Sequence, residues 1–232
     1  MRKYTAEFLA TFILVFCGTG AIIINDISHG QIGHAGIATV FGLVVMAMIY
    51  SFGEISGAHM NPAVSIAFWI SGRFPGKSVV PYVISQLLGA FLASAVWYIL
   101  YPDHKTLGAT LPAGTLLQTF VLEVILTFIL MLVIMQVSTG SKETGTMAGL
   151  AIGAVVWLEA MFAGPVTGAS MNPARSLAPA VFSGETEQLW IYIAAPLLGA
   201  IFGILGCVCI KGHECCALPN KNGTKTQAEK CG

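Results

Sequence analysis

Six long apolar stretches constrain this chain more than any other feature of its sequence. The hydrocarbon core of a bilayer is about 30 Å thick, and a helix needs about 20 residues to cross it. Charged residues make up only 9% of the 232 residues, against roughly 25% in soluble domains. The sequence therefore predicts an all-α membrane protein with six transmembrane helices, at about residues 4–24, 36–52, 79–100, 116–137, 147–163 and 189–210.

The basic residues predict how these helices are oriented. If the amino terminus lies inside the cell, nine of the eleven Lys and Arg residues fall on cytoplasmic segments. Lys105 falls outside, and Arg175 lies in a connection between two helices. Because Lys and Arg concentrate in cytoplasmic loops, we expect both termini in the cytoplasm and a location in the plasma or inner membrane. The formal net charge of zero gives no reason to expect a nucleic-acid partner.

One octapeptide occurs twice, in near-identical form, at residues 56–63 and 167–174. Each copy contains Asn-Pro-Ala, in which Asn suits the cap of a helix and Pro suits its first position. The apolar runs that follow, residues 64–70 and 176–181, are too short to span a bilayer. Each copy is therefore predicted to begin a re-entrant half-helix at the motif residues Asn61, Pro62, Ala63, Asn172, Pro173 and Ala174.

The repeat extends beyond the octapeptide, because a Glu followed one turn later by Thr occurs in the first and fourth apolar stretches, at Glu7 and Glu123. Three spans in each half give the halves opposite orientations, an inverted repeat that places a pathway near the membrane midplane. We expect one channel domain and a short tail: the halves at about residues 4–100 and 116–210, the domain at 1–210 and a cytoplasmic Cys-containing tail at 211–232.

The two loops are predicted to line a pore. Irregular backbone at membrane depth occurs where it borders water or protein, and positive helix amino termini and Asn amides there would favour solute oxygens over cations. For one Asn-Pro alone, a simple helix cap would be the better interpretation. His59 is equally well explained as a hydrogen-bonded structural residue. The expected pore backbone comprises Gly57, Ala58, His59, Gly168, Ala169 and Ser170.

Glu7 and Glu123 are expected to anchor these loops. Each would be buried in a spanning helix, where its carboxylate can accept hydrogen bonds from loop amides that lipid cannot satisfy. A proton relay is the alternative role for such residues. A coupled secondary transporter, which also contains inverted repeats and buried carboxylates, is accordingly a more distant alternative function.

The whole pattern, over residues 4–210, resembles the aquaporin, or major intrinsic protein, superfamily: paired Asn-Pro-Ala loops, the second of which continues into Arg175. The resemblance implies a passive channel for small neutral solutes, not an enzyme, without a cofactor. It also implies a homotetramer in membrane lipid, with a pore in each protomer. A structural junction protein with a vestigial pore would share the pattern, and permeability measurements would distinguish it.

The resemblance also implies an outer selectivity filter. Its positions lie twenty residues before the first motif Asn, twelve and three before the second, and three after it, which gives Phe41, Ala160, Ala169 and Arg175. An intramembrane Arg normally faces a wet cavity. An ion pair with Glu159 is the other explanation for Arg175.

Two departures within the filter bear on the solute. Water-selective members have His where this chain has Ala160, and glycerol facilitators have a bulky aromatic at Ala169 and Asp at Ser176. Residues 162–177 look more like the nodulin-like intrinsic proteins and their bacterial relatives, which conduct polyols such as glycerol and metalloid hydroxides (arsenite, antimonite and boric acid). A channel mainly for water or glycerol is the alternative.

The remaining chemistry-bearing residues predict no site. Five of the six Cys lie at or after residue 207, and cytoplasmic thiols are normally reduced, so disulfides are not expected. His213-Glu214-Cys215-Cys216 lacks the usual zinc-ligand spacing. His29 and His34 each lie beside a Gly and are expected in a loop, without a metal.

Overall fold

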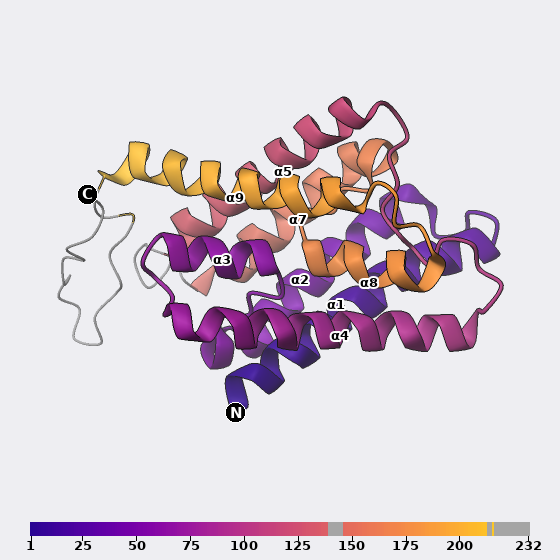
Figure 1. The fold of residues 1–232 in the computed structure, drawn as a ribbon, viewed down its shortest axis with the longest axis horizontal. Coiled ribbons are helices and arrows are strands. Elements are labelled where there is room, and N and C mark those ends of the chain that lie inside the picture. Colours follow the sequence, from indigo (N-terminus) through magenta and orange to yellow (C-terminus); the bar gives the residue numbers. More distant parts are fainter. Residues whose placement is uncertain (139–145, 213–214, 216–232) are drawn as a thin grey trace.

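The computed structural model describes residues 1–138, 146–212 and 215. Six helices in these residues are long and apolar enough to cross a membrane. They run side by side as a bundle along the long axis of the molecule (Figure 1). The predicted all-α fold is confirmed, with spans α1 (Arg2–Ile27), α2 (Gly33–Ser56), α4 (Val79–Leu100), α5 (Leu116–Val137), α7 (Ala148–Thr167) and α9 (Leu189–Lys211).

Two shorter helices, α3 (Pro62–Ile70) and α8 (Pro173–Ser183), are the predicted half-helices. Asn61 and Asn172 are their N-caps, with extended backbone, and the following Pro is the first helical residue in each. The two helices lie one beyond the other between α4 and α9 (Figure 1). A single 3₁₀ turn, η1 (Gly76–Ser78), leads from α3 into α4.

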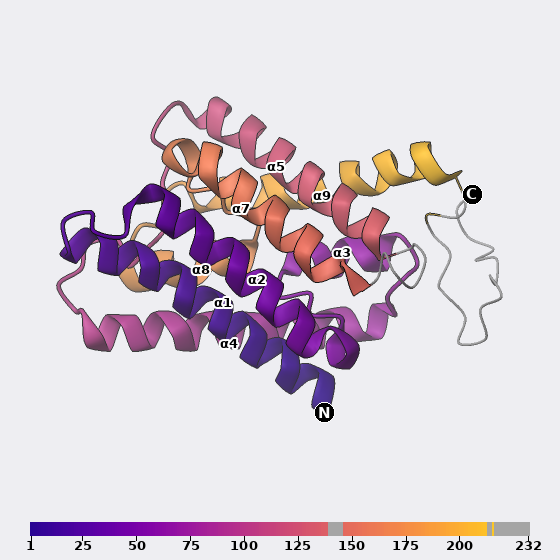
Figure 2. The same ribbon diagram turned by 180° about the vertical axis from the view of Figure 1, so that it is seen from behind.

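The two halves of the chain pack in the same way. Helix α1 contacts α2 and α4, α5 contacts α7 and α9, and α2 joins the halves through α7 (Figure 2). Gly89 on α4 and Gly199 on α9 occupy equivalent crossings, where a Cβ would collide with a backbone carbonyl of α1 or α5. At the α2–α7 crossing, a Cβ on Gly42 would lie 2.8 Å from the carbonyl oxygen of Gly153. Small residues therefore allow backbone-to-backbone contact at each crossing.

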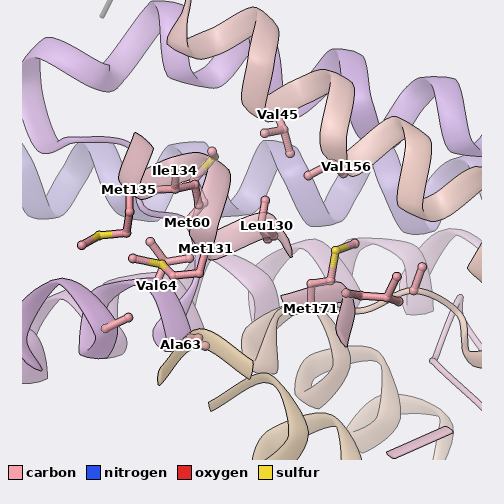
Figure 3. Close-up of a cluster of buried hydrophobic side chains, with 14 of the residues drawn as sticks. Val45, Met60, Ala63, Val64, Leu130, Met131, Ile134, Met135, Val156 and Met171 are labelled. Atoms are coloured by element: carbon pink, nitrogen blue, oxygen red, sulfur yellow. The ribbon is translucent and has the colours of Figure 1, made fainter. Parts of the chain in front are cut away.

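The buried core lies at the centre of the bundle, around the two loops. Met60 and Met171, one from each loop, are both 3% exposed. Figure 3 shows them among side chains from the spanning helices, including Val45, Leu130 and Val156. Both methionines have left-handed backbone, with φ of 51° and 54°. Their side chains anchor the loops in the core and hold backbone that is unfavourable for residues other than Gly.

Two sequence-based expectations are wrong in detail. Helix α2 begins at Gly33, so His34 is helical and does not lie in a loop. Cys207 and Cys215 form a disulfide, with Cα atoms 5.8 Å apart. Cys207 lies in the last turns of α9, and Cys215 lies beside it although it follows the end of that helix at Lys211. The rest of the tail, residues 213–214 and 216–232, lies outside the described residues.

Candidate functional site

Two buried carboxylates hold the two loops. Glu7 accepts hydrogen bonds from the backbone N–H groups of His59 (2.9 Å) and Met60 (2.8 Å). Glu123 accepts them from Ser170 and Met171 (both 2.9 Å). Both carboxylates lie at 0% exposure. The two carboxylates thus accept hydrogen bonds from loop N–H groups that would otherwise be unsatisfied within a membrane.

Each carboxylate also has one side-chain donor. Gln86 Nε2 donates to Glu7 (2.8 Å), and the Thr167 hydroxyl donates to Glu123 (2.7 Å). A tyrosine completes each half in the same way: the Tyr82 hydroxyl donates to Ser56 O and the Tyr192 hydroxyl donates to Thr167 O, both at 2.8 Å. These tyrosines satisfy carbonyls at the ends of α2 and α7.

The first residue of each octapeptide has a role that the sequence reasoning missed. The side-chain oxygens of Ser56 and Thr167 accept the backbone N–H of Ala58 and Ala169, each at 3.0 Å. Ala58 and Ala169 have left-handed backbone, with φ of 47° and 42°. The available signal was a hydroxyl residue at the first position of both copies.

The two motif asparagines bond across the centre of the molecule. Asn61 Nδ2 donates to Met171 O (2.7 Å), and Asn172 Nδ2 donates to Met60 O (2.8 Å). Their Oδ1 atoms cap the half-helices by accepting the N–H of Ala63 (2.9 Å) and Ala174 (3.0 Å). The Asn residues are therefore caps and also links between the loops. Each amide has a second N–H that these bonds do not use.

These asparagines border a cavity of about 500 Å³. All four residues of the predicted filter border it, and so do both asparagines. The lining continues along α2 to Glu54 and along α5 to Ser138. Gly57, Ala58, His59, Ala169 and Ser170 also border it. Gly168 does not; it ends α7 with φ 83° and packs against Thr110, where a Cβ would lie 2.9 Å from the Thr110 methyl carbon.

Arg175 borders the cavity and is 2% exposed. Its Cζ is 5.2 Å from the centroid of the Phe41 ring. Its Nη1 donates to Gly108 O (2.8 Å), in the connection between α4 and α5. Glu159 is also fully buried, but its two oxygens have no hydrogen-bond partner among the described residues. The alternative ion pair between Arg175 and Glu159 is not formed in this part of the chain.

The connection that supplies Gly108, residues 101–115, enters the protein and was not anticipated. Leu107 is 2% exposed, and a Cβ on Gly108 would lie 2.8 Å from Thr19. The Thr110 hydroxyl donates to Ser176 Oγ (2.8 Å) beside Arg175. The only sequence signal was an apolar Leu107 beside Gly108 in this connection, and their contacts depend on tertiary packing.

The two other histidines of interest have defined partners. His59 borders the cavity, and its Nδ1 lies 3.0 Å from Ser65 Oγ, so both roles considered for it are compatible with the structure. His34 Nε2 bonds to Met161 O (2.6 Å). Pro165 lacks the N–H that would bond this carbonyl in a regular helix, so His34 replaces it.

The described residues contain no group of three or more His, Cys, Asp or Glu suited to a metal ion.

Six apolar spans and two half-helices, whose amino ends meet at a lined cavity, define the class: a multi-pass membrane channel. The chain belongs to the family described as Major intrinsic protein, whose model matches residues 1–206. This is a family of channels and not of enzymes.

Individual relatives agree with this assignment. The chain is 48% identical to Aquaporin NIP1-1 of Zea mays over 204 residues, which cover 88% of this chain and 72% of that protein. It is equally similar to Nodulin-26 of Glycine max, with 88% and 75% covered. Among solved structures, the aquaglyceroporin from Plasmodium falciparum matches with a TM-score of 0.77 and 27% identity, covering 87% of this chain and 93% of that one.

Proposed function

We propose that the protein is a passive channel for water and small uncharged solutes, with its selectivity filter at Phe41, Ala160, Ala169 and Arg175. The observation that carries the proposal is that these four residues, from α2, α7, the second loop and α8, border one cavity together with both motif asparagines, and that Arg175 Cζ lies 5.2 Å from the centroid of the Phe41 ring. Solutes would pass the filter and then the two half-helix amino ends in single file.

The same geometry supports exclusion of ions. The amino ends of α3 and α8 carry the positive ends of helix dipoles, and they face one another across the Asn61–Asn172 pair. Arg175 adds a full positive charge at the filter. A cation would be repelled first by one of these positive charges and then by the other, whereas a neutral solute would meet no such electrostatic barrier. This arrangement favours a channel over a coupled transporter.

The composition of the filter supports a solute larger than water. Ala160 and Ala169 present methyl groups, and Phe41 presents a ring, so part of the wall is apolar. Arg175 provides donors on another side. Polyols and metalloid hydroxides have hydroxyl groups that such donors can hold and a less polar flank for the apolar wall. The name of one structural relative, an aquaglyceroporin, supports glycerol as a member of this solute class.

We place both termini in the cytoplasm and the protein in the plasma or inner membrane, as a homotetramer. The Lys and Arg distribution supports this orientation. Large apolar side chains remain exposed on the outside of the bundle, for example Ile99 at 75%, Leu117 at 73% and Val80 at 64%. Lipid and neighbouring protomers would cover these surfaces.

The test is the permeability of proteoliposomes to water, glycerol and arsenite, with Ala160→His and Ala169→Cys combined. Added bulk should reduce glycerol and arsenite permeability more than water permeability, because water needs only its own width. We expect the ratio of arsenite to water permeability to fall by about tenfold, which corresponds to roughly 1.4 kcal/mol of added barrier. An unchanged ratio in well-folded protein would refute the filter. Wild-type vesicles permeable to water but not to arsenite would instead favour a water channel.

A further inference from the structure

The connection between α4 and α5 contains a histidine for which no role follows from the motifs. We propose that His104 is a positioning residue for the filter arginine. It fixes the turn that presents Gly108 O to Arg175, so that the geometry of the filter depends on a side chain outside it. This inference rests on the proposed role of Arg175 in the filter.

The imidazole of His104 bonds in two directions. Its Nδ1 accepts the backbone N–H of Leu107 (3.1 Å). Its Nε2 lies 3.3 Å from Asp26 Oδ2 at the end of α1. Because Nδ1 accepts a hydrogen bond, Nε2 carries the hydrogen and donates a hydrogen bond to the Asp26 carboxylate. The His104 side chain is only 9% exposed, whereas that of Asp26 is 50% exposed. The ring therefore joins α1 to the connection.

The turn that His104 holds is one that the chain does not adopt readily. Leu107 and Gly108 both have left-handed backbone, with φ of 49° and 73°. For Leu this conformation is unfavourable and needs external support. The bond from His104 to the Leu107 N–H supplies part of that support. Burial of the Leu107 side chain with Ile23 and Trp97 supplies another part.

The conformation of this turn determines where Arg175 lies. Gly108 O is the partner of Arg175 Nη1 (2.8 Å), and Gly108 itself packs against Thr19 without room for a side chain. The buried Nε of Arg175 has no hydrogen-bond partner among the described residues. Gly108 O is thus the hydrogen-bond partner of the guanidinium, whose Cζ also lies 5.2 Å from the centroid of the Phe41 ring, and a displacement of that carbonyl would move the guanidinium.

The two nitrogens of His104 can be tested separately by substitution. Asn places an oxygen near the position of Nδ1, so His104→Asn can still accept the Leu107 N–H. Gln places its amide near the position of Nε2, so His104→Gln can still bond Asp26 but not Leu107. His104→Ala removes both bonds. Lys105→Ala, at an exposed neighbouring position, is the matched control.

The readout is the ratio of glycerol to water permeability in proteoliposomes of the full chain. We expect His104→Ala and His104→Gln to change this ratio by at least about twofold. Such a change is the smallest effect expected of a residue that acts on a site through another residue. His104→Asn and Lys105→Ala should keep the wild-type ratio. If His104→Ala does not fold, the comparison of Asn with Gln remains decisive. Equal ratios for these two variants would overturn the inference.

A double-mutant cycle with Arg175→Ala separates this inference from the proposed filter. In the Arg175→Ala background, His104→Ala should cause no further change in the ratio, because the residue through which it acts is gone. If the two changes are additive, His104 acts in another way and the inference is wrong. If Arg175→Ala alone leaves the ratio unchanged, the proposed filter itself is refuted.

Discussion

Glu123 and Glu159 provide a matched pair of buried carboxylates for a test of stability. Both lie at 0% exposure, 36 residues apart by number, on the adjacent helices α5 and α7. Glu123 accepts three hydrogen bonds, from Thr167, Ser170 and Met171, whereas neither oxygen of Glu159 has a partner among the described residues. The same change, Glu to Gln, should therefore destabilise the protein much more at Glu123 than at Glu159.

The magnitude follows from the bonds. In Glu123→Gln one oxygen becomes an NH₂ group, which cannot accept the Met171 N–H, and that bond to a charged acceptor contributes about 1.5–3 kcal/mol. The two bonds to the remaining oxygen change from charged to neutral and weaken by about 1 kcal/mol each. We therefore expect Glu123→Gln to destabilise the protein by roughly 3–5 kcal/mol. Glu159→Gln breaks no bond in the described structure and should change stability by less than about 1 kcal/mol.

The assay is unfolding of purified protein in detergent, followed by loss of the assembled form on size-exclusion chromatography as temperature rises. Glu123→Gln should yield less assembled protein and a lower midpoint, while the solute selectivity of the surviving protein stays close to wild type. Equal losses for the two variants would refute the reasoning that loop anchoring, rather than burial alone, determines the cost. A well-expressed Glu123→Gln protein with altered ion coupling would favour a transporter.

Two further predictions concern ions and the α2–α7 contact. Purified protein in planar bilayers should carry no proton or sodium current while it conducts neutral solutes, because the half-helix amino ends and Arg175 oppose cations; a solute-independent current would contradict this. His34→Ala should lower stability by about 1–3 kcal/mol, since Met161 O loses its partner. Adding Pro165→Ala, which provides a helical N–H for that carbonyl, should recover part of the loss, and thermal unfolding of the single and double variants would show whether it does.

The spans, the half-helices and the motif positions were predictable from sequence because each depends on local chemistry. A bilayer requires about 20 apolar residues per helix, and Asn followed by Pro is a local signal for the start of a helix. The duplication of the octapeptide revealed the symmetry of the two halves. Gly168 was assigned to the pore lining by this symmetry, but Thr110 packs against it, and that contact comes from a connection without an internal repeat.

What the sequence alone determined is the class of protein and the residues that cap and anchor its loops. Periodicity, charge distribution and repetition are properties of the chain, and they suffice to predict that Asn61 and Asn172 begin half-helices and that Arg175 lies in the second of them. Only the tertiary structure decided that Arg175 bonds to Gly108 and not to Glu159, and that His104 holds the turn beside Gly108. These contacts join residues 67 positions apart in the first case. They depend on the path of a connection through the folded protein, and local propensity does not encode that path.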